Sequence, residues 1–153
     1  MVTGLANNAN VEVEITSSNV TTEAMVGLGV IGGKDVIRKF QTVYFDTDRG
    51  IEETATGKTF SPDVALVHEL GHIQNAIDSP TDFVNRKASP DPVWGNLEEK
   101  QTTTKYEDPY AASRGMLQRT GYATGYKPVK TINSTNATTP KQLGNIMRAV
   151  LGF

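Results

Sequence analysis

The chain of 153 residues contains no cysteine and only two histidines. The lack of cysteine excludes disulfide bonds, thiolate metal ligands and cysteine nucleophiles. No run of about eighteen apolar residues occurs, so we expect no membrane-spanning segment. The formal net charge is −2, and a chain without a basic excess is a poor candidate for binding a phosphate backbone. We therefore expect no nucleic-acid partner.

The N-terminal residues lack the features of a secretory signal. Residues 1–14 contain neither a basic region nor an apolar core, so we expect no cleavable signal peptide. Residues 1–10 are small and polar, and we expect them to be loose. The length fits a single domain that covers residues 1–153.

Two segments of the N-terminal third have the pattern of β-strands. Residues 11–17 alternate aliphatic and acidic side chains, which is the period of a half-buried strand. Residues 40–48 are rich in β-branched and aromatic residues and end in turn formers, so we expect a second strand there. Residues 23–33 are apolar but contain four glycines, and neither helix nor strand is favoured.

Helix signals dominate the rest of the chain. The clearest helix begins with Ser61 as N-cap, Pro62 at the first position and Asp63 in the first turn. We expect it to end at Ser79-Pro80 and to be followed by a proline-rich loop as far as residue 95. Residues 96–105, 108–121 and 138–153 are further helix candidates, with Asp108 as the cap of the second. Strands followed by helices predict an α+β domain with a small N-terminal sheet and a helical C-terminal half.

Both histidines lie on the predicted helix in the pattern H-E-x-x-H. Side chains four residues apart on a helix share a face, with Cβ atoms about 5–6 Å apart, so His68 and His72 can bind one metal ion. Glu69 follows the first histidine and can reach a water molecule at that metal. Two imidazole ligands and a general base are the basis of zinc peptidase chemistry.

The simpler alternative is a pair of buried histidines with ordinary hydrogen bonds. A helix this apolar gives two imidazoles and a carboxylate few partners, and each polar group needs one when it is buried. The spacing therefore favours a zinc site.

The composition restricts the third protein ligand. With no further histidine and no cysteine, the ligand must be a carboxylate or, as a weaker alternative, a tyrosine. The downstream carboxylates are Asp78, Asp82, Asp91, Glu98, Glu99, Glu107 and Asp108. The first two are too close to the helix end to fold back easily. The Glu98–Glu99 pair lies on a separate predicted helix, where a His-His-Glu site takes its third ligand.

Hydrolysis of a peptide bond also needs hydrogen-bond donors for the oxyanion. No histidine is left for this purpose, so the available donors are arginine and tyrosine. The sequence RTGY offers Arg119 and Tyr122 together. Taken alone, such a pair is more typical of a protein surface.

Three motifs in series resemble a known group of zinc peptidases. SPDVALVHELGH, LEEKQT and EDPYAASRGMLQRTGY are similar in order and spacing to the NleD-type effector metallopeptidases of bacterial pathogens and to the active-site segments of clostridial neurotoxin light chains. The resemblance covers residues 60–126. Lys100 and Gln101 differ from the Leu-Arg pair of those families.

The resemblance implies a zincin-like, gluzincin-type fold and a role for each motif residue. His68, His72 and Glu99 would bind Zn²⁺, and Glu69 would be the catalytic base. Glu98 would orient a ligand histidine. Arg119 and Tyr122 would stabilise the oxyanion, with Glu107 holding Arg119.

The function implied is that of a zinc endopeptidase acting on a protein of a target cell. The resemblance implies a secreted or injected bacterial effector or toxin that acts in the target cytosol. The domain would be free-standing or excised from a larger toxin, and a cognate inhibitor or immunity protein is expected for a toxin. Two alternatives remain: a housekeeping cytosolic zinc peptidase, and a non-catalytic zinc-containing binding module.

Overall fold

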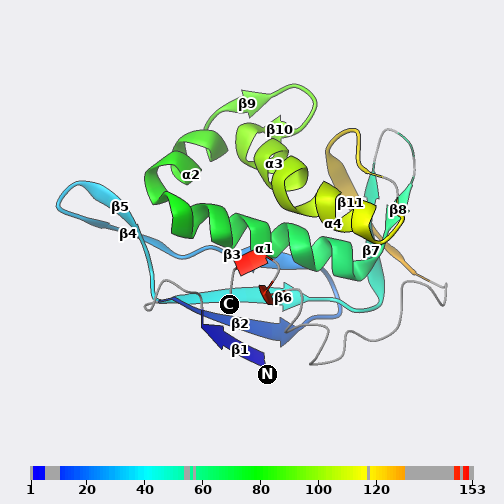
Figure 1. Cartoon of the computed structure of the whole chain (residues 1–153), viewed down its shortest axis with the longest axis horizontal. Coiled ribbons are helices and arrows are strands. Elements are labelled where there is room, and N and C mark those ends of the chain that lie inside the picture. Colours follow the sequence, from blue (N-terminus) through cyan, green and yellow to red (C-terminus); the bar gives the residue numbers. More distant parts are fainter. Residues whose placement is uncertain are drawn as a thin grey trace.

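The computed structural model describes residues 2–5, 11–53, 56, 58–116, 118–129, 147–148 and 150–151. An N-terminal β-sheet forms one layer, and a layer of helices covers it (Figure 1). The expected α+β architecture, with a small N-terminal sheet and helices after it, is confirmed.

The main sheet has four strands in the order β1-β2-β6-β3. These strands are β1 (Val2–Leu5), β2 (Glu12–Ser17), β6 (Phe40–Phe45) and β3 (Glu23–Met25). β2 and β6 are parallel, and both outer pairings are antiparallel. The two predicted strands are thus confirmed. Residues 2–5 were expected to be loose but pair with β2, while residues 1 and 6–10 lie outside the described residues.

The described residues form three smaller sheets besides the main one. A hairpin joins β4 (Leu28–Ile31) to β5 (Lys34–Ile37) through Gly32 and Gly33, whose φ values of 58° and 77° suit glycine. A second sheet has the order β11-β7-β8. Its strands are β11 (Ala123–Pro128), β7 (Arg49–Glu53) and β8 (Thr59–Phe60). A short pair, β9 (Pro90–Asp91) and β10 (Gly95–Asn96), lies beside the helices. Because β11 returns to β7, the expectation of a helical C-terminal half is wrong for this segment.

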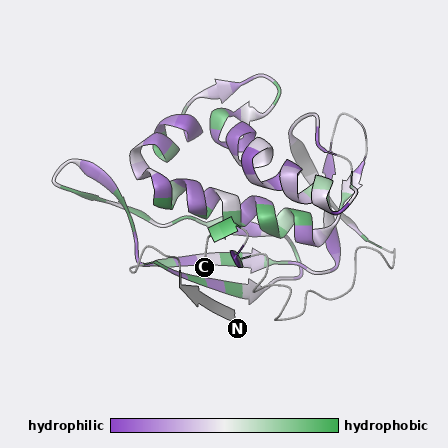
Figure 2. Cartoon of the chain, in the orientation of Figure 1, coloured by the Kyte–Doolittle hydropathy of each residue, from purple (hydrophilic) through white to green (hydrophobic). Residues whose placement is uncertain are grey.

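Helix α1 (Pro62–Asp78) is the centre of the molecule. Ser61 is the N-cap and Pro62 opens the helix, as predicted, although the Ser61 hydroxyl bonds to the Asp63 carboxylate instead of a backbone N–H. The helix packs on the main sheet through apolar residues, and the hydropathy colours of Figure 2 show them on both layers. The core residues are Val11, Val13, Ile15, Val43, Phe45, Leu66, Val67, Leu70, Ile73, Met147, Val150 and Leu151.

Helix α2 (Pro80–Lys87) replaces the predicted proline-rich loop. The Ser79 hydroxyl accepts a hydrogen bond from the Asp82 N–H, and Pro80 occupies the first turn, so this helix begins with the same signals as α1. Phe83 is buried and packs its ring edge-on to the ring of His72 on α1. The loop prediction is therefore wrong for residues 80–87, whereas Pro90 lies in the two-residue strand β9 and Pro92 lies in the turn that follows it.

The next helical run is continuous where two separate helices were expected. It consists of α3 (Leu97–Thr102), a π-helical turn η1 (Thr103–Glu107) and α4 (Asp108–Ser113). The prediction that Asp108 caps a new helix is wrong, because its φ of −60° and ψ of −45° are helical. Pro109 lacks the N–H that would continue the α-helical hydrogen bonding, and the π-turn lies just before it.

The predicted C-terminal helix is described only in part. Residues 147–148 and 150–151 are helical, and Met147, Val150 and Leu151 belong to the core. The rest of residues 138–153 lies outside the described residues. Within the described part of the chain, no helix is long and apolar enough to cross a membrane.

Candidate metal centre

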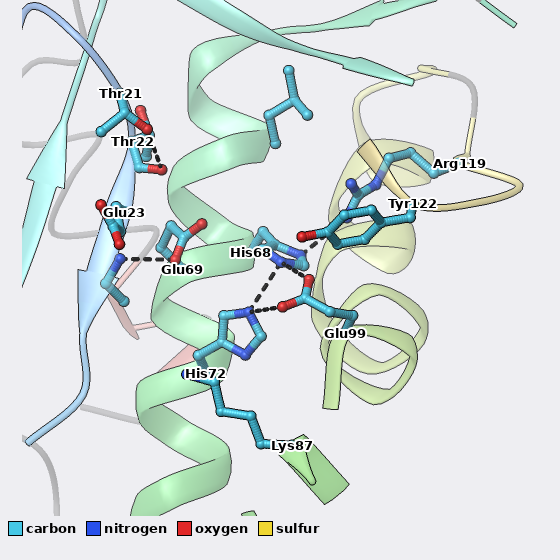
Figure 3. Close-up of a pocket in the computed structure, with 12 residues that line it drawn as sticks. Thr21, Thr22, Glu23, His68, Glu69, His72, Lys87, Glu99, Arg119 and Tyr122 are labelled. Carbon is cyan, nitrogen blue, oxygen red and sulfur yellow. Dashed lines mark hydrogen bonds and ion pairs between the residues drawn. The ribbon is translucent and has the colours of Figure 1, made fainter. Parts of the chain in front are cut away.

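Helices α1 and α3 bring three side chains to one point (Figure 3). His68 and His72 project from successive turns of α1, and Glu99 faces them from α3. Asn96 sets the position of α3, because its side-chain oxygen accepts hydrogen bonds from the N–H groups of Glu98 and Glu99 at 2.9 and 3.0 Å. Adjacent residues on a helix differ in direction by about 100°, so Glu99 faces the site while Glu98 points to a different side of the helix.

The glycine of HELGH allows the two helical segments to approach closely. A Cβ atom at Gly71 would lie 2.7 Å from a ring carbon of Tyr106 and 2.8 Å from the methyl group of Thr102. Any larger residue would push α3 and η1 away from α1. Gly71 therefore contributes to the site through packing, which the motif alone does not indicate.

The three ligand atoms have the spacing of a metal site. His68 Nε2 lies 3.1 Å from His72 Nε2 and 3.1 Å from Glu99 Oε2. His72 Nε2 lies 3.4 Å from Glu99 Oε1. Ligand atoms at the corners of a tetrahedral zinc site are about 3.3 Å apart, because zinc–ligand bonds are about 2.0–2.1 Å long. The residues present fit a zinc ion.

The outer ring nitrogens of both histidines face carboxylates. His68 Nδ1 lies 2.8 Å from Glu107 Oε2, and His72 Nδ1 lies 3.2 Å from Glu98 Oε1. A neutral imidazole that donates its Nδ1–H to a carboxylate has an acceptor at Nε2. Two such acceptors and the Glu99 carboxylate then converge with no donor between them. Three hydrogen-bond acceptors this close together need a cation between them, either protons or a metal ion.

The pKa values of the group in its metal-free form agree with this conclusion. Burial lowers the pKa of His68, but hydrogen bonds that its ring donates to the carboxylates of Glu107 and Glu99 outweigh burial and raise the pKa to about 10. The pKa of His72 is also raised, because the hydrogen bonds that its ring donates to the carboxylates of Glu98 and Glu99 outweigh burial. Burial raises the pKa of Glu99, yet its bonds to both histidines hold it far below the ordinary range. A divalent metal that binds here must displace protons.

Glu98 is a fully buried carboxylate with four hydrogen-bond partners. Besides His72, it accepts bonds from Asn75 Nδ2 at 2.8 Å, Thr102 Oγ1 at 3.0 Å and Arg86 Nε at 2.7 Å. Burial raises the pKa of Glu98, but the bonds from His72, Asn75 and Arg86 lower it overall. Sequence reasoning missed three of these partners. Asn75, three residues after His72 on α1, was detectable, and Thr102 closes the LEEKQT motif but was given no role. Arg86 carried no local signal.

Glu107 and Arg119 form a second buried pair behind His68. Arg119 Nη2 donates to Glu107 Oε2 at 2.5 Å and to Thr103 Oγ1 at 2.9 Å. Arg119 is 6% exposed and Glu107 is 1% exposed. Arg119 Nε is also buried and has no hydrogen-bond partner among the described residues. A buried donor without a partner in the wall of a cavity suits an acceptor supplied by a ligand.

One cavity of about 260 Å³ is lined by the three metal-ligand candidates together with Glu69, Arg119 and Tyr122. The Glu69 carboxylate accepts a hydrogen bond from the Ala24 N–H of β3 at 2.8 Å. Residues 21–24 form the opposite wall, and Lys87 lies at the α2 side. Six of the eight predicted site residues thus line the cavity, and Glu98 and Glu107 lie behind the histidines.

The other carboxylates considered as third ligand lie elsewhere. Asp78 pairs with Lys105 and Asp91 with Lys100. Asp108 accepts a bond from the Arg119 N–H. In the part of the chain that the structure describes, Glu99 is the carboxylate that joins His68 and His72 in a metal-binding group.

Comparisons with known proteins place the chain in no family. No protein-family model matches it, and neither a curated protein nor a solved structure does.

Proposed function

We propose that the protein is a zinc-dependent endopeptidase with a zincin-like fold. The observation that carries the proposal is the convergence of His68 Nε2, His72 Nε2 and a Glu99 oxygen, with all these atoms within 4.8 Å of one another, in a cavity that also contains Glu69. A purely structural zinc site has four protein ligands and no base beside it. Three protein ligands and a neighbouring carboxylate favour catalysis.

His68, His72 and Glu99 would hold the Zn²⁺ ion, which would supply a water molecule of lowered pKa and polarisation of the substrate carbonyl. Glu69 accepts the proton from the attacking water and delivers it to the leaving amine. The Ala24 N–H holds one oxygen of this carboxylate, which restricts the side chain in the wall of the cavity.

Arg119 and Tyr122 supply donors for the oxyanion. The phenol of Tyr122 stays protonated, because burial and the neighbouring Glu99 charge both raise its pKa. Each such donor commonly contributes about 3–4 kcal/mol to stabilising the transition state. Glu107 keeps the Arg119 side chain in the wall of the cavity through their buried ion pair.

The substrate class and the site of action are carried over from the resemblance to effector and neurotoxin peptidases. The substrate is a polypeptide of a target cell, cut internally, after the protein has been secreted or injected as an effector or toxin. An inhibitor or immunity protein would protect the producing cell. This part is an analogy from the motifs at residues 60–126.

The test uses the full chain loaded with Zn²⁺ and two peptide libraries, one made from a eukaryotic cytosol and one from a bacterial cytosol. Mass spectrometry would identify new peptide termini. We expect cleavage by the wild type, none by Glu69→Gln with equal zinc content, and wild-type cleavage by Glu14→Gln on β2. Cleavage by Glu69→Gln contradicts the mechanism. Zinc binding without any new termini in the wild type supports a binding module instead.

A further inference from the structure

The segment from Arg119 to Tyr122 is held through its backbone. It has no regular secondary structure, yet four consecutive N–H groups find acceptors on other elements. The Arg119 N–H donates to Asp108 Oδ1 at 3.3 Å, and the Tyr122 N–H donates to Val93 O at 3.1 Å. Between them, the N–H groups of Thr120 and Gly121 donate to Glu53 Oε1 at 2.5 and 3.0 Å. A single distant carboxylate thus holds the middle of the segment.

Glu53 is placed for this role by β7. It is the last residue of that strand, it is fully buried, and it pairs in register with Ala123 at the start of β11. The Thr120 hydroxyl adds a third bond to the same oxygen at 3.0 Å, and the Thr56 hydroxyl bonds to the other. All these donors are uncharged groups. Burial raises the pKa of Glu53, but the bonds from Thr56, Thr120 and Gly121 lower it below the ordinary value, so the carboxylate is ionised.

The anchored segment carries both proposed oxyanion donors. Arg119 lies directly before the two N–H groups that Glu53 binds, and Tyr122 lies directly after them. Neither donor has the support of a helix, whereas the metal-ligand candidates have α1 and α3. A displacement of about 1 Å in a catalytic group can lower a rate about 100-fold. The Arg119 side chain is also held by Glu107 and Thr103, so the placement of Tyr122 depends most on the backbone acceptors of this segment.

We propose that Glu53 is a positioning residue for the peptidase reaction, which acts by fixing Thr120 and Gly121 and thereby the donors on either side. The proposal rests on the proposed function. It assigns Glu53 no contact with the substrate or the metal. It predicts that losing the carboxylate lowers kcat and leaves zinc content and KM unchanged, because the zinc ligands belong to other elements.

The experiment measures kcat and KM of the zinc-loaded full chain with a peptide that the wild type cleaves. Glu53→Gln keeps the size and one acceptor oxygen, and we expect kcat to fall about 10-fold; Glu53→Ala should lower it about 100-fold. The control is Asp63→Asn. Asp63 also accepts side-chain bonds, from Ser61, Tyr110 and Arg114, but lies outside the cavity, so the kcat of Asp63→Asn should equal that of the wild type.

A double-mutant cycle separates positioning from general stability. If Glu53 acts partly through Tyr122, Glu53→Gln lowers kcat by a smaller factor in the Tyr122→Phe background than in the wild type. The same factor in both backgrounds, or an unchanged kcat in Glu53→Gln, overturns the proposal while the peptidase function stands. No cleavage by the wild type overturns the proposed function and this inference with it.

Discussion

The two halves of the candidate site are built in different ways. The metal-ligand half consists of helical side chains, each tied to a buried side-chain partner: His68 to Glu107, and His72 to Glu98. The oxyanion half is a non-helical segment tied mainly through its backbone. Its Arg119 side chain also bonds to Glu107 and Thr103, while Tyr122 is 42% exposed. Helical geometry fixes the ligands before anything binds, while the donor segment depends on contacts with Glu53 on β7, Asp108 on α4 and Val93 between β9 and β10. Changes in the first half should therefore alter metal binding, and changes in the second should alter turnover.

The largest effect is expected for Glu99→Ala. Loss of a direct ligand should weaken zinc binding by more than the roughly 10–100-fold typical of outer contacts. The measurement is a competition titration with a chromophoric zinc chelator, and Glu14→Ala on β2 is the control. Unchanged affinity in Glu99→Ala would mean that another group completes the site.

Tyr122→Phe tests the second half of the comparison. Removing one oxyanion donor commonly lowers kcat by roughly 10²–10³-fold. Zinc affinity and Tm should stay at wild-type values, because Tyr122 is not a metal-ligand candidate and is 42% exposed. Tyr44→Phe on β6 is a matched control, since Tyr44 is 41% exposed. Loss of zinc in Tyr122→Phe would contradict the division between the two halves.

Glu98→Gln should reduce zinc affinity by about 10–100-fold, because an outer partner orients the ligand histidine. The amide keeps the shape but removes the charge that His72 and Arg86 face. Arg86→Gln should shift the affinity in the same direction, as it removes the cation behind Glu98. Isothermal titration of the metal-free variants with Zn²⁺ gives both values. If both variants bind Zn²⁺ as tightly as the wild type, Glu98 contributes to packing and does not orient His72 for metal binding.

The smallest effect is a pH dependence of the metal-free chain. The pKa of His68 is raised from 6.5 to about 10, so its contribution to stability is complete below about pH 6.5 and is lost as the pH rises towards 10. The pKa values of Glu98 and Glu99 are lowered from 4.5, so their contribution is lost on acidification below that value. The Tm of the metal-free chain should therefore fall between pH 7 and 10.

Saturating zinc should remove that fall, because the bound metal replaces the protons on the histidines. Scanning calorimetry at several pH values, with and without zinc, measures both curves. A Tm of the metal-free chain that rises from pH 7 to 10 would contradict the predicted ion pairing.

Sequence patterns found what is encoded locally. Alternation predicted β2, and the Ser61-Pro62-Asp63 start with HELGH predicted α1 and two of its ligand candidates. Helix α2 was missed because Pro80 was interpreted as the end of one helix when it also begins the next. Partners that only folding brings together could not be predicted from local patterns. Glu53 and Thr120, for example, are 67 residues apart in the chain. The motif RTGY predicted the donor pair Arg119 and Tyr122. No motif predicted Glu53, the carboxylate that binds the backbone between them.

The most direct test of the central claim is the zinc content of the full chain, measured by elemental analysis after purification without added metal and again after Zn²⁺ is restored. The convergence of His68, His72 and Glu99 predicts one zinc per chain, retained in Glu107→Ala, in which no direct ligand is changed, and lost in Glu99→Ala. No bound zinc in the wild type, even after the metal is restored, would contradict the metal centre and the peptidase function that depends on it.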